Sequence, residues 1–81
     1  MFTPLNERVS VVVVYANNAV KPYKLRWRGQ EHLIEKITLT SDLTEGIIKR
    51  RVYSVQFAGA LYRLEFNRMT EHWKLLEVYC E

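Results

Sequence analysis

Side chains that could act as nucleophiles, acids, bases or metal ligands are few in this sequence, and they are scattered. A nucleophilic Cys80 would need a base and an orienting group close by, and a position next to the last residue is a poor place to hold them. His32 and His72 are too far apart to resemble a local metal-ligand pair. The three glycines stand singly, so no phosphate-binding loop is present. We therefore expect no catalytic residue, no bound metal and no cofactor, and a chain that is not an enzyme.

The chemical feature that stands out is a set of basic residues on short segments of β character. If those segments are neighbours in a sheet, the side chains form one stripe of the kind with which small barrels hold single-stranded nucleic acid. A solvated sheet face, with lysine and arginine protecting strand edges against aggregation, would give the same pattern. The candidate nucleic-acid-binding residues are Lys24, Arg26, Arg28, Lys49, Arg50, Arg51 and Arg63.

The segment that carries the first three of these cations has a clear period of two. Tyr23, Leu25 and Trp27 alternate with the cations, which places the apolar residues on a core face and the charges on the other face. The other large aromatic residues also fall on the apolar sides of their segments. Few rings are then left for stacking on bases.

The segment Val9–Ala16 is a strand of a different kind. It is rich in β-branched residues and carries apolar side chains at both alternating sets of positions. Such a strand is either covered on both faces or uses one face as an interface, because an exposed one would aggregate. We therefore expect a homo-oligomer or a protein partner.

Residues 31–40 fit either a helix or a strand. We favour a strand, because only Gly29-Gln30 separates this run from Trp27, and Ile37–Thr40 is strongly β in character. Residues 41–46 have the composition of a loop.

The second half of the chain predicts a hairpin and one further strand. Tyr53, Val55 and Phe57 alternate inward, residues 58–60 turn, and residues 62–66 alternate back, followed by a strand over 73–79. Six short strands indicate an all-β fold, a small antiparallel meander that forms an SH3-like barrel or a curled sheet. It would be a single domain over 1–81, with residues 1–7 as an N-terminal extension. The predicted core comprises Val11, Val13, Leu25, Trp27, Val55, Phe57, Leu64, Phe66, Trp73 and Leu75.

Composition limits the setting in which the chain works. With 81 residues and a net charge of +3, it is large enough for one modest core and only mildly basic. A single cysteine excludes an internal disulfide and favours a reducing compartment, the cytoplasm. The longest apolar run is far shorter than the ~20 residues that span a bilayer, so we expect no membrane partner.

Several short motifs resemble those of a known family. Trp27-Arg28-Gly29, Arg51–Val55, Leu61–Phe66 and Trp73-Lys74-Leu75 are similar to a small uncharacterised bacterial domain. That domain occurs alone or at the C-terminus of Y-family-polymerase-like mutagenesis proteins. The resemblance implies an all-β fold and, by association, a role in DNA transactions.

Two binding functions follow from these observations. The first is weak binding of nucleic acid, or of a nucleic-acid-processing partner, through the basic residues. The second is protein interaction or self-assembly through Val9–Ala16. One contiguous basic patch would favour the first, and cations interleaved with carboxylates would favour a solvated surface.

Overall fold

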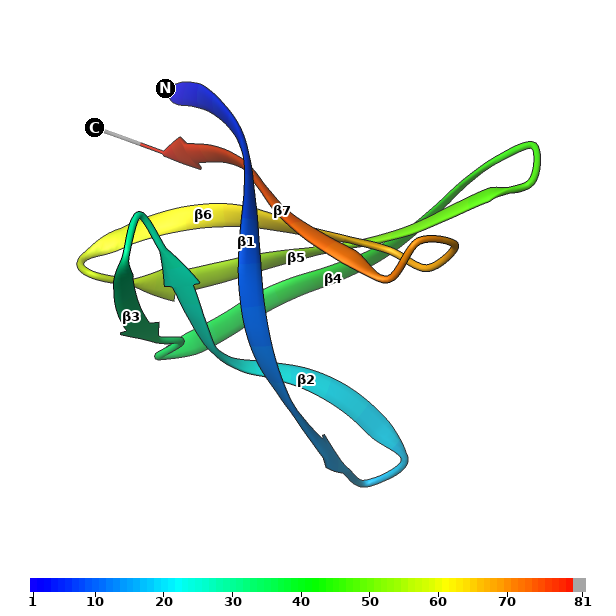
Figure 1. Cartoon of the computed structure of the whole chain (residues 1–81), viewed down its shortest axis with the longest axis horizontal. Coiled ribbons are helices and arrows are strands. Elements are labelled where there is room, and N and C mark those ends of the chain that lie inside the picture. The colour runs from blue at the N-terminus through cyan, green and yellow to red at the C-terminus, as the bar shows by residue number, and fades with distance from the viewer. Residues whose placement is uncertain (80–81) are drawn as a thin grey trace.

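The computed structural model describes residues 1–79 and is built from antiparallel strands (Figure 1). The predicted all-β class and curled sheet are confirmed, with seven strands in place of six. The strands are β1 (Phe2–Ala16), β2 (Ala19–Trp27), β3 (Gln30–Leu33), β4 (Lys36–Glu45), β5 (Ile48–Phe57), β6 (Ala60–Asn67) and β7 (His72–Tyr79).

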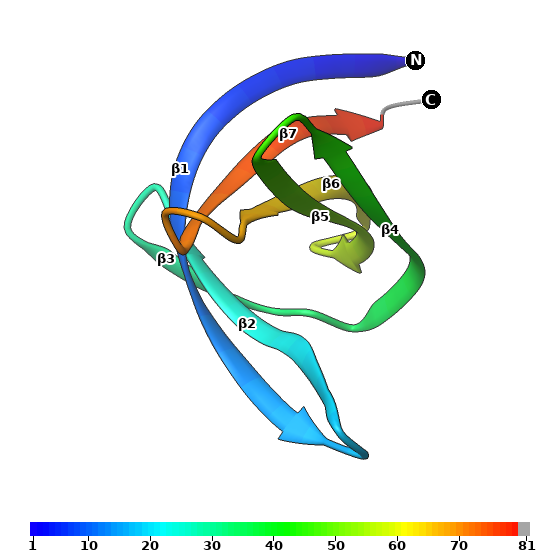
Figure 2. The same ribbon diagram turned by 90° about the vertical axis from the view of Figure 1, so that its right-hand side faces the viewer.

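The strand order is β3-β2-β1-β7-β6-β5-β4. Two meanders, β1 to β3 and β4 to β7, are therefore joined by pairing of the first strand with the last. The sheet curls but is not closed by pairing of β3 with β4 (Figure 2). The residues between these strands bridge the opening, because Ile34 N donates to Tyr23 O at 2.9 Å and Glu35 N donates to Gln56 O at 2.8 Å.

Tight turns set the register of three of the hairpins. Asn17 and Asn18 have φ of 53° and 59°, and Ala58 and Gly59 have φ of 50° and 76°. Two consecutive residues with positive φ give a turn whose twist matches that of the flanking strands. Arg28 and Gly29, at 53° and 76°, form the same kind of turn between β2 and β3.

The core lies on the concave side of the curled sheet. Five predicted core residues are confirmed as fully buried: Leu25, Val55, Phe57, Leu64 and Leu75. Four more, Val11, Trp27, Phe66 and Trp73, are half-buried and pack against that cluster. The Phe57 ring stacks on Tyr62 with centroids 3.9 Å apart, so aromatic contacts fill the middle of a core that contains no buried charged residue among residues 1–79.

Two inward assignments were wrong, those of Val13 and Tyr23, which are 42% and 45% exposed. A bulge is the reason for the second: Val12 pairs with Lys24 and Val13 pairs with Pro22, which leaves Tyr23 as the extra residue. Pro22 is buried in its place. Val13 is exposed because the end of the β1–β2 hairpin extends beyond the rest of the sheet (Figures 1 and 2).

Residues 31–40 are extended and not helical, as predicted, but they are divided between β3 and β4. The loop predicted over 41–46 was wrong, because residues 41–45 continue β4 and pair with β5 as far as Glu45 opposite Ile48. Polar residues are tolerated there because this hairpin also projects into solvent (Figure 1). The first strand starts well before Val9: Phe2 pairs with Tyr79, so residues 2–7 belong to the sheet.

Candidate functional site

The predicted basic residues fall into two separate groups in the sheet. Lys24 and Arg26 lie on β2 and Arg28 in the turn after it, whereas Lys49, Arg50, Arg51 and Arg63 lie on β5 and β6. Two strands, β1 and β7, separate β2 from β6. The run at residues 49–51 is itself divided between the faces, because Arg51 shares the inward side with Tyr53 and Val55 and Arg50 points the other way.

Four of the seven cations pair with carboxylates. The ion pairs are Lys24 with Glu31 (3.7 Å), Arg28 with Glu7 (2.6 Å), Arg51 with Asp42 (2.7 Å) and Arg63 with Glu77 (4.0 Å). These cations are interleaved with acidic side chains and do not form one contiguous stripe.

Glu7 links β1 to the turn between β2 and β3, a role that the sequence did not reveal. Its carboxylate accepts hydrogen bonds from Trp27 Nε1 at 3.0 Å and from the Arg28 guanidinium at 3.1 and 2.6 Å. Arg28 also lies 4.6 Å over the Trp27 ring. These donors, above all Arg28, lower the pKa of Glu7. Arg28 therefore pairs with a carboxylate on β1 and stacks on a neighbouring ring.

Arg51 has a similar structural role on the inward side of β5. Its guanidinium donates to Asp42, the residue directly opposite on β4. The hydrogen bond lowers the pKa of Asp42 and raises the pKa of Arg51. This pair connects the two strands of the projecting β4–β5 hairpin.

A different group of cations comes together on the outer face of β1, β2 and β7. Arg8 pairs across the strands with Lys74, and Ser10 pairs with Arg26. None of the three cations has a carboxylate partner within 4.0 Å among residues 1–79. Arg8 donates to the His72 imidazole, beside a hollow of about 610 Å³ that Arg26 also lines. Only the pairing of β1 with β7 brings Arg8 and Lys74 together, so no sequence signal could have identified this group.

The two histidines lie in different environments. The His32 ring packs 5.0 Å from Phe57 in the core, whereas His72 lies on the surface at the start of β7. Across residues 1–79 no group of three potential metal ligands was found. Cys80 is outside the described residues.

The most conspicuous surface is the end of the β1–β2 hairpin. Val12, Val13, Val14 and Tyr15 are consecutive and 50%, 42%, 44% and 69% exposed, and Val20 opposite them is 38% exposed. No charged residue occurs between positions 9 and 20. We call residues 12–20 the apolar hairpin.

The backbone of this region also has a free edge. Residues 10–16 of β1 pair with β2 alone, because β7 pairs with residues 2–9. The donors and acceptors on the other edge of this half-strand have no strand partner within the described chain. An uncharged free edge is able to take up another strand.

A cleft of about 740 Å³ separates the apolar hairpin from β4 and β5. Val14, Val20, Ile37 and Tyr53 line it, together with charged residues that include Lys21 and Arg51. The Tyr53 hydroxyl donates to Val20 O at 3.4 Å, which ties the β2 strand of the hairpin to the core two residues after the Asn17-Asn18 turn. The inner side of the hairpin therefore faces a partly apolar space.

Neither a family model, nor a curated protein, nor a solved structure matches this chain. The resemblance to the domain of mutagenesis proteins stays a prediction. Within residues 1–79 no helix is long and apolar enough to cross a membrane.

Proposed function

We propose that this chain is a protein-interaction module that binds through the apolar hairpin. The observation that carries the proposal is the run Val12 to Tyr15, four consecutive apolar residues that are each at least 42% exposed. Because successive side chains of a strand point to opposite faces, both faces of the hairpin are apolar. A partner could therefore contact it from either side.

Burial of this surface would yield a useful binding energy. Complete burial of one valine is worth about 1.5–3 kcal/mol, so covering the exposed half of each of four valines gives roughly 4 kcal/mol before the costs of association. Tyr15 adds a large ring with a hydroxyl, a side chain often enriched in binding surfaces. With no cation between positions 9 and 20, this surface suits a protein and offers nothing to a phosphate.

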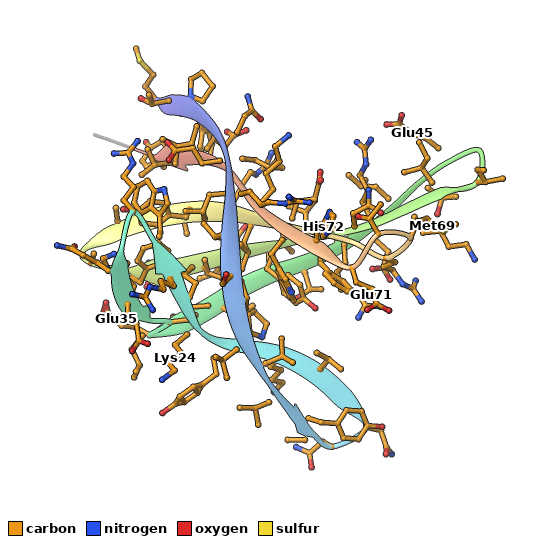
Figure 3. All side chains as sticks on the ribbon, viewed as in Figure 1. Lys24, Glu35, Glu45, Met69, Glu71 and His72 are labelled. Carbon is orange, nitrogen blue, oxygen red and sulfur yellow. The ribbon has the colours of Figure 1, made fainter. Side chains whose placement is uncertain are left out.

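The test is photo-cross-linking in cells that express the chain, with a photoreactive amino acid at position 15. Position 69 is the matched control, because Met69 is 58% exposed against 69% for Tyr15 and lies in the turn between β6 and β7 (Figure 3). We expect discrete cross-linked species from position 15 alone. Equal products from both positions, or none from position 15, would refute the proposal.

A second candidate function is weak binding of nucleic acid by the outer-face group Arg8, Arg26 and Lys74. The supporting observation is that none of these three cations forms an ion pair within 4.0 Å among residues 1–79, in contrast to Lys24 and Arg63, although Glu31 lies opposite Arg26 and Glu65 opposite Lys74 across the strands. Binding through phosphates would be insensitive to sequence and would weaken steeply with salt.

Fluorescence anisotropy with a labelled single-stranded oligonucleotide at low salt tests this candidate. We expect Arg8→Glu combined with Arg26→Glu to abolish binding, and Arg63→Glu, which reverses an already paired cation, to retain most of it. Absence of binding by the wild type would eliminate the nucleic-acid function.

A further inference from the structure

We infer that the partner of the apolar hairpin is a second copy of this chain, joined to the first by antiparallel pairing of the two β1 edges about a twofold axis at Val13. The inference rests on the proposed function and names its partner. The two sheets would then become continuous through residues 10–16 of both chains.

The free strand edges of the described chain differ in charge. Each of the others carries charge: the first half of β1 has Glu7 and Arg8, the first half of β2 has Lys21, β3 has Glu31, and β4 has Lys36, Asp42 and Glu45. Charged side chains on an edge oppose pairing with another strand. Residues 10–16 form the one free edge in the described chain without such protection.

Residues 10–16 are also chemically suited to pair with a second copy of themselves. With the twofold axis at Val13, Val12 of each copy lies opposite Val14 of the other, and Val11 lies opposite Tyr15. Every cross-strand contact is then between uncharged residues, and β-branched and aromatic pairs are among the favourable ones. A twofold arrangement uses the same surface on both copies, so the pairing closes at a dimer and does not extend into a fibre.

The length of the free edge determines the register of the pairing. The free segment runs from Ser10 to Ala16, and its midpoint is Val13. An axis at Val13 places all seven free residues opposite one another. An axis at Val12 would place Arg8, which already pairs with Lys74 on β7, opposite Ala16. Only the axis at Val13 uses the whole free edge without disturbing the pairing of β1 with β7.

The contact is smaller than the ~800 Å² per partner of a standard stable interface, because it comprises one strand edge and a few half-exposed side chains. We therefore expect a dimer with micromolar affinity. Sedimentation velocity of the wild-type chain across the micromolar range should show a monomer–dimer equilibrium.

Disulfide trapping tests the register in a Cys80→Ser background. Across the proposed axis the two Val13 Cα atoms would be about 4.5–5.5 Å apart, within the range for a disulfide. The two Ser10 positions would be about 20 Å apart, since six residues of strand separate them. Under mild oxidation, Val13→Cys should form a covalent dimer rapidly, and the control Ser10→Cys should form one at least tenfold more slowly.

Charge substitution gives a second test, in which recovery of the dimer also reports whether the variants fold. Val13→Lys alone and Val13→Glu alone should each be monomeric, because like charges meet at the axis. A mixture of the two should form a dimer again, which shows that both variants keep the fold.

Three results would overturn the inference: a wild-type monomer throughout the micromolar range, equal trapping of Val13→Cys and Ser10→Cys, or no dimer in the charge-swapped mixture. A monomer whose position 15 still cross-links to another protein in cells would remove the second copy as partner and leave the proposed function standing. Loss of both the dimer and the cross-link would remove both.

Discussion

Replacement of Phe57 by alanine is the most direct perturbation of the core. Phe57 is 0% exposed and meets three rings: Tyr62 at 3.9 Å, His32 at 5.0 Å and Trp27 at 6.5 Å between centroids. Removal of such a side chain lowers the free energy of unfolding by about 3–5 kcal/mol, because apolar burial is lost and a cavity is left behind. We expect the upper part of that range, because each well-placed aromatic pair adds about 0.5–1.5 kcal/mol.

That loss is large in comparison with the whole stability of the domain. At roughly 0.05–0.15 kcal/mol per residue, a chain of this size has about 4–12 kcal/mol in total. With a denaturant dependence near ~1 kcal/mol per molar urea, the unfolding midpoint should fall by roughly 4 M, or the variant should be unfolded in water. Urea titration followed by tryptophan fluorescence measures this, since Trp27 is in the same aromatic cluster.

Phe2→Ala is the matched control, because Phe2 is also on a strand but is 42% exposed. The Phe2→Ala substitution should lower the free energy of unfolding by less than about 1 kcal/mol. A loss below about 1 kcal/mol for Phe57→Ala, or equal losses for the two variants, would mean that the core does not lie on the concave side between β5, β6 and β2.

Three further predictions concern other parts of the fold. Trp73 lies between Tyr53 at 5.7 Å and Phe66 at 4.6 Å, so Trp73→Ala should cost about 3–5 kcal/mol in the urea titration, and a loss below ~1 kcal/mol would show that its face is exposed. The pKa of Glu7 is lower in the folded chain than its ordinary value of 4.5. The ionised carboxylate therefore contributes fully to folding stability above pH 4.5, and this contribution is lost as the pH falls through the lowered pKa. The stability of the wild type should therefore fall more steeply than that of Glu7→Gln on acidification below pH 4.5, and parallel pH profiles would contradict the link to Arg28. Ala58 has φ of 50°, which asparagine tolerates better than alanine, so Ala58→Asn should raise the thermal midpoint by several degrees, and an unchanged or lower midpoint would argue against this turn.

The sequence by itself determined the fold class and most of the core. Alternation over residues 53–57 and 62–66 placed Val55, Phe57 and Leu64 on one buried face, and the structure confirms all three. This worked because the side-chain period of a strand is two whatever its neighbours are. Composition and β-branching likewise identified Val9–Ala16 as a strand with two apolar faces.

The sequence could not show which strands become neighbours. Pairing of β1 with β7 joins the two ends of the chain, and it alone brings Arg8 beside Lys74. The same long-range order puts β1 and β7 between the two groups of predicted cations, so the single stripe that neighbouring segments would have formed is not present. Local patterns carry no information on such contacts, because they depend on how the whole sheet curls.

Exposure of the apolar hairpin was also decided by the tertiary structure. The valines at 12 to 14 have the same character as the buried Val9, but they extend past the point where β7 begins, because Val9 pairs with Trp73. A bulge opposite Val12 and Val13 then turns Tyr23 outward. Residue type sets how strongly a side chain favours burial, whereas the length of the neighbouring strands decides whether anything is there to cover it.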